Sequence, residues 1–247
     1  MFENKGYAHN KVGLDQQIEC NRYVAKVFLT MFWGLLITAA ASFSVAFVGP
    51  LTAIFMNPIS LIVCIIAEFV LVWRLSSKLH SMSYTKAKNM FWIYSILNGI
   101  TLSSIFYAYD ISSIFSAFLV ASASFGVMSL YGLSTKKDLT SIGSLMTMGL
   151  FGLIILSVIN MILRLFIAVT ALTWIISILG LVIFLGLTAF DAQKIKNYFF
   201  TYSGYGGSFD NESTVNKVGI IGALSLYLDF INIFLFLLRI FGRSSRD

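Results

Sequence analysis

The sequence predicts an all-α integral membrane protein with seven transmembrane helices, and three observations lead to that class. Hydrophobic residues make up 58% of the 247-residue chain, and only 11% of its residues are charged. Because soluble domains carry about 25% charged residues, this chain cannot cover a core with a polar surface. Phe is abundant at 23 residues and Pro is rare at 2, which favours long uninterrupted helices. The alternating ten-residue segments of a transmembrane β-barrel do not stand out.

Seven apolar stretches reach the roughly 20 residues that a helix needs to cross a bilayer. They are Tyr23–Val48, Phe55–Leu75, Asn89–Tyr107, Ser112–Leu133, Leu139–Leu163, Ile167–Lys194 and Val218–Phe241. The weakest boundary is that between the fifth and sixth spans, which only Arg164 marks.

We divide the chain into a polar N-terminal tail at residues 1–22 and one seven-helix transmembrane domain at residues 23–247. The tail lacks the arrangement of a secretory signal peptide.

The basic residues are distributed unevenly between the two ends of the predicted spans. All 17 Lys and Arg residues lie on one side of the membrane except Arg164, Arg239, Arg243 and Arg246. The positive-inside rule therefore predicts a cytoplasmic N-terminus, here in a bacterial inner membrane, since the composition is typical of an AT-rich bacterium. Seven full spans place the C-terminus outside, although its basic sequence is more typical of a cytoplasmic end. A re-entrant last helix would account for that sequence.

Other classes of function find little support in the sequence. The net charge of +6 comes from basic residues scattered through short loops, so nucleic acid is not an expected partner. Cys20 and Cys64 lack metal-ligand spacing, and His9 and His80 do not form a metal pair. No nucleophile motif or phosphate-binding loop occurs. We therefore expect neither an enzyme nor a resident cofactor, and the oligomeric state stays open.

Three acids fall in the apolar stretches, and they raise the question of function. They are Glu68, Asp191 and Asp229. A central Asp costs about 2.5 to 3.5 kcal/mol on membrane-insertion scales, so each carboxyl has to face protein or a wet cavity, where it will often hold a proton. Glu68 is either an ion-pathway group or a structural partner in an ion pair or inter-helix hydrogen bond. The small and polar residues Asn98, Gly99 and Thr101 predict close helix packing.

Asp229 belongs to a polar stripe on the last span. Gly222, Ser225, Asp229 and Asn232 recur at spacings of three, four and three residues, which places them on one helical face. A helix surrounded by lipid has no use for such a face. The stripe therefore predicts that the last helix lies in the middle of the bundle, with Ser225 and Asn232 as candidates for an ion pathway.

Asp191 lies near the cytoplasmic end of the sixth span, one turn after the further ion-pathway candidate Thr188. A loop joins the sixth and seventh spans on that side, so the carboxyls of Asp191 and Asp229 can approach each other. Two carboxyls in contact cannot both ionise cheaply, and a shared proton is the usual outcome. Such a pair would act as a proton-controlled latch. Two plainer interpretations remain: Asp191 reaches the headgroup region beside Lys194, or Asp229 is a structural hydrogen-bond partner.

Four segments carry a resemblance to a known family. "FDAQKI" ends the sixth span, and "ALSLYLDFINIFLFLLRIFG" fills the seventh. Together with "AEFVLVW" in the second span and "LNGITLSSIF" in the third, they resemble the Bax inhibitor-1 (transmembrane Bax-inhibitor-motif) family, bacterial members in particular. The resemblance extends from the first span onward and does not include the tail.

The resemblance implies a fold in which two three-helix layers surround a central C-terminal helix. It also implies a pH-sensitive calcium leak channel gated by a hydrogen-bonded aspartate pair, which corresponds to Asp191 and Asp229. Family members commonly have Tyr-Asp-Thr-Gln where this chain has "FDAQ", so two hydroxyls are lost. A basic residue late in the second span is tied to the gate in the family, and Arg74 and Lys78 are the candidates here.

Calcium prefers six to eight oxygen ligands, so Asp191 and Asp229 would hold Ca²⁺ only transiently, with water and carbonyl groups completing its shell. Two other functions stay open. Some relatives resemble modulators of a membrane-anchored protease or of other partner proteins, a role that would depend on the tail and loops. A proton-coupled transporter would also use buried carboxyls, but inverted repeats and broken helices are not evident.

Overall fold

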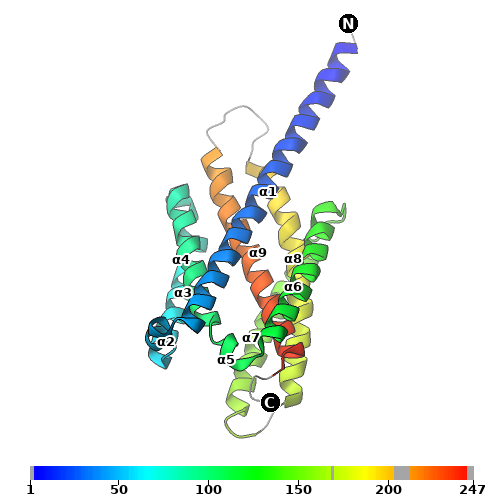
Figure 1. Cartoon of the computed structure of the whole chain (residues 1–247). Helices are drawn as coiled ribbons and strands as arrows, with labels where there is room; N and C mark the ends of the chain where they lie inside the picture. The colour runs from blue at the N-terminus through cyan, green and yellow to red at the C-terminus, as the bar shows by residue number, and fades with distance from the viewer. Residues whose placement is uncertain (1–2, 168–169, 203–211, 244–247) are drawn as a thin grey trace.

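The computed structural model describes residues 3–167, 170–202 and 212–243, which are almost entirely helical (Figure 1). Within these residues, seven helices are long and apolar enough to cross a membrane. The predicted class, an all-α integral membrane protein with seven transmembrane helices, is therefore confirmed.

The seven long helices correspond in order to the seven predicted spans. They are α1 (Glu3–Phe47), α3 (Pro58–Lys78), α4 (Tyr84–Leu102), α6 (Ile111–Ser134), α7 (Thr140–Leu163), α8 (Thr170–Tyr202) and α9 (Glu212–Phe241). Shorter helices connect them: α2 (Gly49–Phe55), the 3₁₀ turn η1 (Leu79–Ser81) and α5 (Ile105–Ala108).

Two of the helix starts have caps that the sequence encodes. Asn57 precedes α3, where its side-chain oxygen accepts a hydrogen bond from the backbone N–H of Ser60 at 2.9 Å. Ser83 precedes α4, and its hydroxyl accepts from the backbone N–H of Lys86 at 3.3 Å. Each cap satisfies a backbone donor that has no partner within its own helix.

The first helix begins well before the predicted start at Tyr23, so that boundary is wrong. α1 runs from Glu3, and its span begins at Asp15. Cys20 is already buried, with 2% of its surface exposed. The predicted start followed hydropathy alone. A helix can extend beyond its apolar part through a polar segment that contains no proline. The division of the chain at residue 22 into a tail and a domain stays a prediction.

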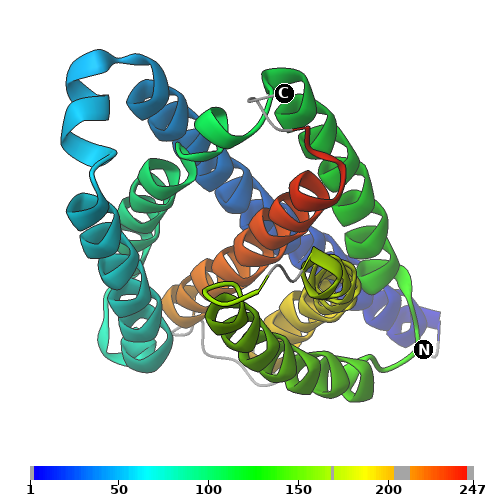
Figure 2. The ribbon, with the colours of Figure 1, turned by 90° about the horizontal axis from the view of Figure 1, so that it is seen from below.

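The helices form two layers with α9 between them (Figure 2). α1, α3 and α4 make one layer, in which α4 contacts both of the others. α6, α7 and α8 make the second layer, in which α8 contacts both of the others. α9 packs against α1 and α4 on one side and against α6 and α8 on the other. This arrangement confirms the central position that the polar stripe predicts.

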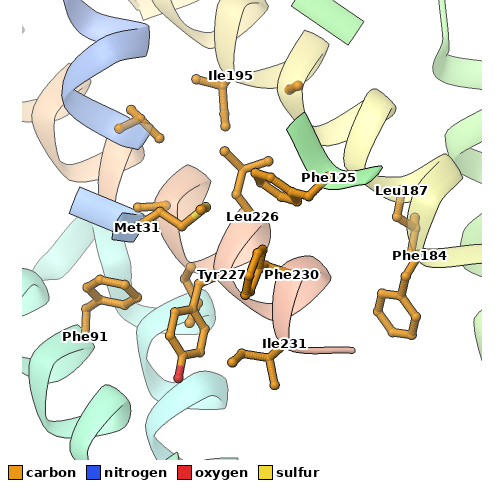
Figure 3. Close-up of a cluster of buried hydrophobic side chains, with 14 of the residues drawn as sticks. Met31, Phe91, Phe125, Phe184, Leu187, Ile195, Leu226, Tyr227, Phe230 and Ile231 are labelled. Atoms are coloured by element: carbon orange, nitrogen blue, oxygen red, sulfur yellow. The ribbon is translucent and has the colours of Figure 1, made fainter. Parts of the chain in front are cut away.

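Burial separates the central helix from the outer ones. In the apolar window of α9, 72% of the residues are buried, against 11% in the windows of α3 and α7. Large side chains from α9 and its neighbours fill the space between the layers, including Phe91, Phe125, Leu226, Tyr227 and Phe230 (Figure 3). The outer faces instead expose large apolar side chains, which suits a lipid solvent.

α9 passes through the bundle from one end to the other, so the two termini lie at opposite ends (Figure 1). The last helix is therefore a full span rather than a re-entrant one. Which end faces the cytoplasm stays a prediction.

Candidate functional site

The seam between α8 and α9 carries the predicted aspartates, and it is the most extensive contact between two helices. Gly222 on α9 sits directly against Ile195 on α8. A Cβ at Gly222 would lie 2.8 Å from Cγ1 of Ile195. The absence of a side chain at this position therefore allows the two helices to approach closely.

Asp229 lies deep within this seam. It is 4% exposed, and its Oδ2 atom has no hydrogen-bond partner among the described residues. Asp191 is half-buried on α8, the helix that packs most extensively against α9. The two aspartates that the sequence singles out thus lie on helices that pack against each other, and their pairing stays a prediction. An ionised carboxyl buried without a partner is costly, so Asp229 needs a proton or a cation.

A small cavity lies beside Asp191 in the same seam. It has a volume of about 10 Å³, and its lining includes Asp191, Lys194, Tyr198, Gly222 and Ser225. That volume is close to the lower limit for one water molecule. Ser225 therefore lines the same cavity as Asp191, and its role in an ion pathway stays a prediction.

The other two ion-pathway candidates on these helices bond to their own backbone. Thr188 is fully buried and donates to the carbonyl oxygen of Phe184 at 2.7 Å. The Asn232 side-chain amide donates to the carbonyl oxygen of Leu228 at 2.7 Å. Asn232 lines a separate groove of about 340 Å³. A role for either residue in permeation stays a prediction.

Arg74 and Lys78 are both exposed on α3. Lys194, one turn further along α8, lines the same small cavity as Asp191. The assignment of Arg74 or Lys78 as an ion-pair partner of the gate stays a prediction. The structure adds Lys194 as a neighbouring charge.

Glu68 takes part in a second polar cluster, on the other side of α9. Its two carboxyl oxygens accept hydrogen bonds from Asn98 Nδ2 at 3.1 Å and from Thr101 Oγ1 at 2.9 Å. Both donors belong to α4, so these bonds join α3 to α4. Of the alternatives that the sequence leaves open for Glu68, the structure shows the inter-helix hydrogen bond.

Tyr227 is a central polar residue that the sequence analysis did not single out. Its hydroxyl donates to Asn98 Oδ1 at 2.9 Å and lies 2.6 Å from Thr38 Oγ1. Thr38 in turn lies within hydrogen-bond distance of the Ser95 carbonyl oxygen, at 2.8 Å. The Tyr227 and Thr38 hydroxyls together carry two protons and take part in these three contacts. One of the three contacts therefore has no proton between its two oxygen atoms at any given time. A tyrosine within an apolar span, two residues before Asp229, is the signal that could have revealed this cluster.

Gln193 joins the end of α8 to the connection between α6 and α7. Its side-chain oxygen accepts from the backbone N–H of Leu139 at 2.9 Å, and its Nε2 donates to the Lys137 carbonyl oxygen at 2.8 Å. The residue two positions after Asp191 thus fixes this end of α8 to the connection between the neighbouring helices.

The fold and the seam define a seven-helix membrane protein with a buried aspartate on its central helix. In sequence comparisons, the family described as "Inhibitor of apoptosis-promoting Bax1" matches residues 20–246. The chain belongs to this Bax inhibitor-1 family.

Several curated bacterial proteins are similar over most of their length. Inner membrane protein YbhL of Escherichia coli K12 is 43% identical over 223 residues, which cover 89% of this chain and 91% of that protein. An uncharacterized protein of Borreliella burgdorferi is 41% identical over 228 residues, covering 92% and 94%. An uncharacterized membrane protein of Streptococcus pyogenes serotype M1 is 36% identical over 241 residues, covering 96% and 97%.

Proposed function

We propose that this protein is a pH-sensitive calcium leak channel in which Asp191 and Asp229 form the gate. The observation that carries the proposal is the buried position of Asp229, with one oxygen that has no partner among the described residues, on the helix that packs against the helix of Asp191. Membership of the Bax inhibitor-1 family supports the same function.

In the proposed closed state, the two carboxyls share one proton, which holds α8 against α9. A shared proton removes the repulsion between two carboxylates and gives the buried oxygen of Asp229 a partner. A change of protonation, or the arrival of a cation, removes that hydrogen bond and allows the two helices to separate. The two helices are the moving parts of this gate, and Gly222 allows them to pack closely in the closed state.

Calcium is the permeant ion in this proposal and not a resident cofactor. Two carboxylates supply part of the six to eight oxygen ligands that Ca²⁺ prefers, and water would supply the remainder. Such an incomplete shell binds weakly, which favours passage over storage.

The test is calcium flux into proteoliposomes, measured across a range of pH. The substitutions Asp191→Asn and Asp229→Asn keep the shape of each side chain, but the amide that replaces the carboxyl cannot ionise. We expect each variant to lose most of the pH dependence of the flux, because neither can share a proton between two carboxyls. Asp138→Asn is the matched control, since Asp138 is an exposed acid at the same end of the bundle, outside the seam.

An unchanged pH profile in both seam variants would refute the gate. A protein that conducts no calcium at any pH would refute the channel. Equal effects of the Asp138 variant and the seam variants would show that surface charge, rather than the pair, sets the pH response.

A further inference from the structure

A groove runs between α1 and α6 at the end of the bundle where α1 begins. Its volume is about 460 Å³, and its walls are mainly apolar side chains such as Val24, Leu130 and Leu133. At its inner end, the rings of Phe28 and Phe125 lie 6.3 Å apart between centroids and close the groove. Leu130 is 67% exposed, so the groove opens on the lipid-facing surface of the bundle.

Polar groups occur at two levels of this groove. Lys196, from the end of α8, lines the outer level and donates to the Leu133 carbonyl oxygen at 3.3 Å. An ammonium group has three donors, so Lys196 has others left for a ligand. One turn deeper along α6, Ser129 is 3% exposed, and its hydroxyl has no hydrogen-bond partner in the described part of the chain.

The space beside Gly126 is open. A Cβ built on this glycine meets no atom within 4 Å, whereas a Cβ at Gly132 on the same helix would collide with the backbone of Ala189. Gly126 thus does not serve to bring two helices together. It leaves a section of the groove wall without a side chain, between Ser129 and the closed inner end.

We propose that this groove binds one phospholipid with an anionic headgroup. The phosphate would lie at Lys196, an ester carbonyl would accept a hydrogen bond from Ser129, and an acyl chain would run past Gly126 to the two phenylalanine rings. The order of the groups, polar at Asn21 and Lys196, then the Ser129 hydroxyl, then apolar, matches the order of groups along a phospholipid. Basic pockets between transmembrane helices on the positively charged side of a membrane protein suit anionic headgroups.

The walls argue against a free phosphate as the ligand, since a small anion would leave the apolar part of the groove unfilled. The site is also separate from the aspartate seam, because neither Asp191 nor Asp229 lines it. The lipid proposal therefore stands independently of the proposed calcium leak.

Native mass spectrometry of the detergent-purified full chain tests this inference, with phosphatidylglycerol and phosphatidylcholine of identical acyl chains as the added lipids. We expect one phosphatidylglycerol to be retained in preference to phosphatidylcholine. Lys196→Gln should lower affinity for phosphatidylglycerol about fivefold, with little change for phosphatidylcholine. Lys136→Gln, which alters an exposed cation at the same end outside the groove, should retain the wild-type preference.

Two further variants test the deeper part of the site. Gly126→Leu fills the groove without a clash at Cβ and should weaken binding of both lipids. Ser129→Ala removes a hydroxyl that has no partner among the described residues and leaves the packing in place. It should weaken the binding of both lipids a few fold. Glycerol 3-phosphate should not compete, because it lacks the acyl chains.

The proposal is overturned if the wild type shows no preference for the anionic lipid, or if Lys196→Gln retains that preference unchanged. Binding of both lipids that is unaltered by Gly126→Leu and Ser129→Ala would place the lipid elsewhere. Competition by glycerol 3-phosphate would indicate a site for the headgroup alone and would contradict a phospholipid site.

Discussion

Tyr227 and Asp229 are two polar residues on an otherwise apolar helix, and they face different layers of the bundle. Residues two positions apart on a helix point in roughly opposite directions. Tyr227 accordingly meets Thr38 and Asn98 from the α1/α4 layer, and Asp229 lies buried in the seam with α8. The central helix is therefore joined to the α1/α4 layer by hydroxyl and amide groups, and on its α8 side it carries the Asp229 carboxyl. In the proposed gate the pH response belongs to the α8 side, whereas the Glu68 carboxyl on the other side is hydrogen-bonded to Asn98 and Thr101.

Removing the Tyr227 hydroxyl tests whether its hydrogen bonds hold α9 to the α1/α4 layer. Tyr227→Phe leaves the buried Asn98 oxygen without its donor, so we expect the free energy of unfolding to fall by about 1 to 3 kcal/mol. Thermal unfolding in detergent measures this loss. The pH profile of calcium flux should stay that of the wild type, since the aspartate seam is intact.

Tyr131→Phe is the matched control, because Tyr131 is an exposed tyrosine on α6. A Tyr227→Phe variant as stable as Tyr131→Phe would show that the hydroxyl cluster contributes nothing to holding α9. A shifted pH profile in Tyr227→Phe would mean that the cluster takes part in the gate.

At the scale of helices, glycines set the distances at which neighbours pack. A Cβ at Gly132 on α6 would collide with the Ala189 carbonyl oxygen on α8, and one at Gly99 on α4 would lie 2.5 Å from the Thr38 carbonyl oxygen on α1. Both neighbours are backbone atoms, so neither can rotate away. Lipid offers no hydrophobic drive for helix association, so close backbone approach has to supply much of the packing energy.

Gly132→Ala should force α6 and α8 apart, and we expect it to lower the free energy of unfolding by about 1 to 3 kcal/mol. Thermal unfolding in detergent again measures the change. Gly152→Ala is the matched control, since a Cβ at Gly152 on α7 meets nothing within 4 Å. The control should be neutral or slightly stabilising, because alanine is the better helix former. Equal stability of the two variants would contradict the close contact at Gly132.

At the scale of the whole molecule, an odd number of full spans separates the two termini. The basic residues gather at the end of the bundle where α1 begins, which predicts that this end is cytoplasmic. The aspartate seam and the lipid groove both lie toward that end. A proton or lipid signal would accordingly come from the cytoplasm.

Reporter fusions at each terminus test this orientation in cells. A fluorescent protein that matures only in the cytoplasm should be active at the N-terminus, and a phosphatase that folds only outside should be active at the C-terminus. The reverse combination, or the same side for both, would contradict the predicted topology.

The sequence predicts this architecture well because hydropathy and helical period are local properties of a chain. Span number and the inward-facing stripe on α9 both follow from such patterns. The start of α1 was missed, since a helix can continue beyond its apolar segment. The partners of Glu68 and Tyr227 depend on how α1, α3 and α4 are rotated against α9, and rotation is decided by packing between helices rather than by any one of them.

The most direct test of the central claim is calcium flux of the double variant Asp191→Asn/Asp229→Asn, compared with the two single variants over the same pH range. If the carboxyls share one proton, each single substitution already removes the shared site, so the double variant should match the singles in its residual pH dependence. Effects of the two substitutions that simply add would show two independent groups, and a pH dependence that persists in the double variant would show that the gate titrates elsewhere.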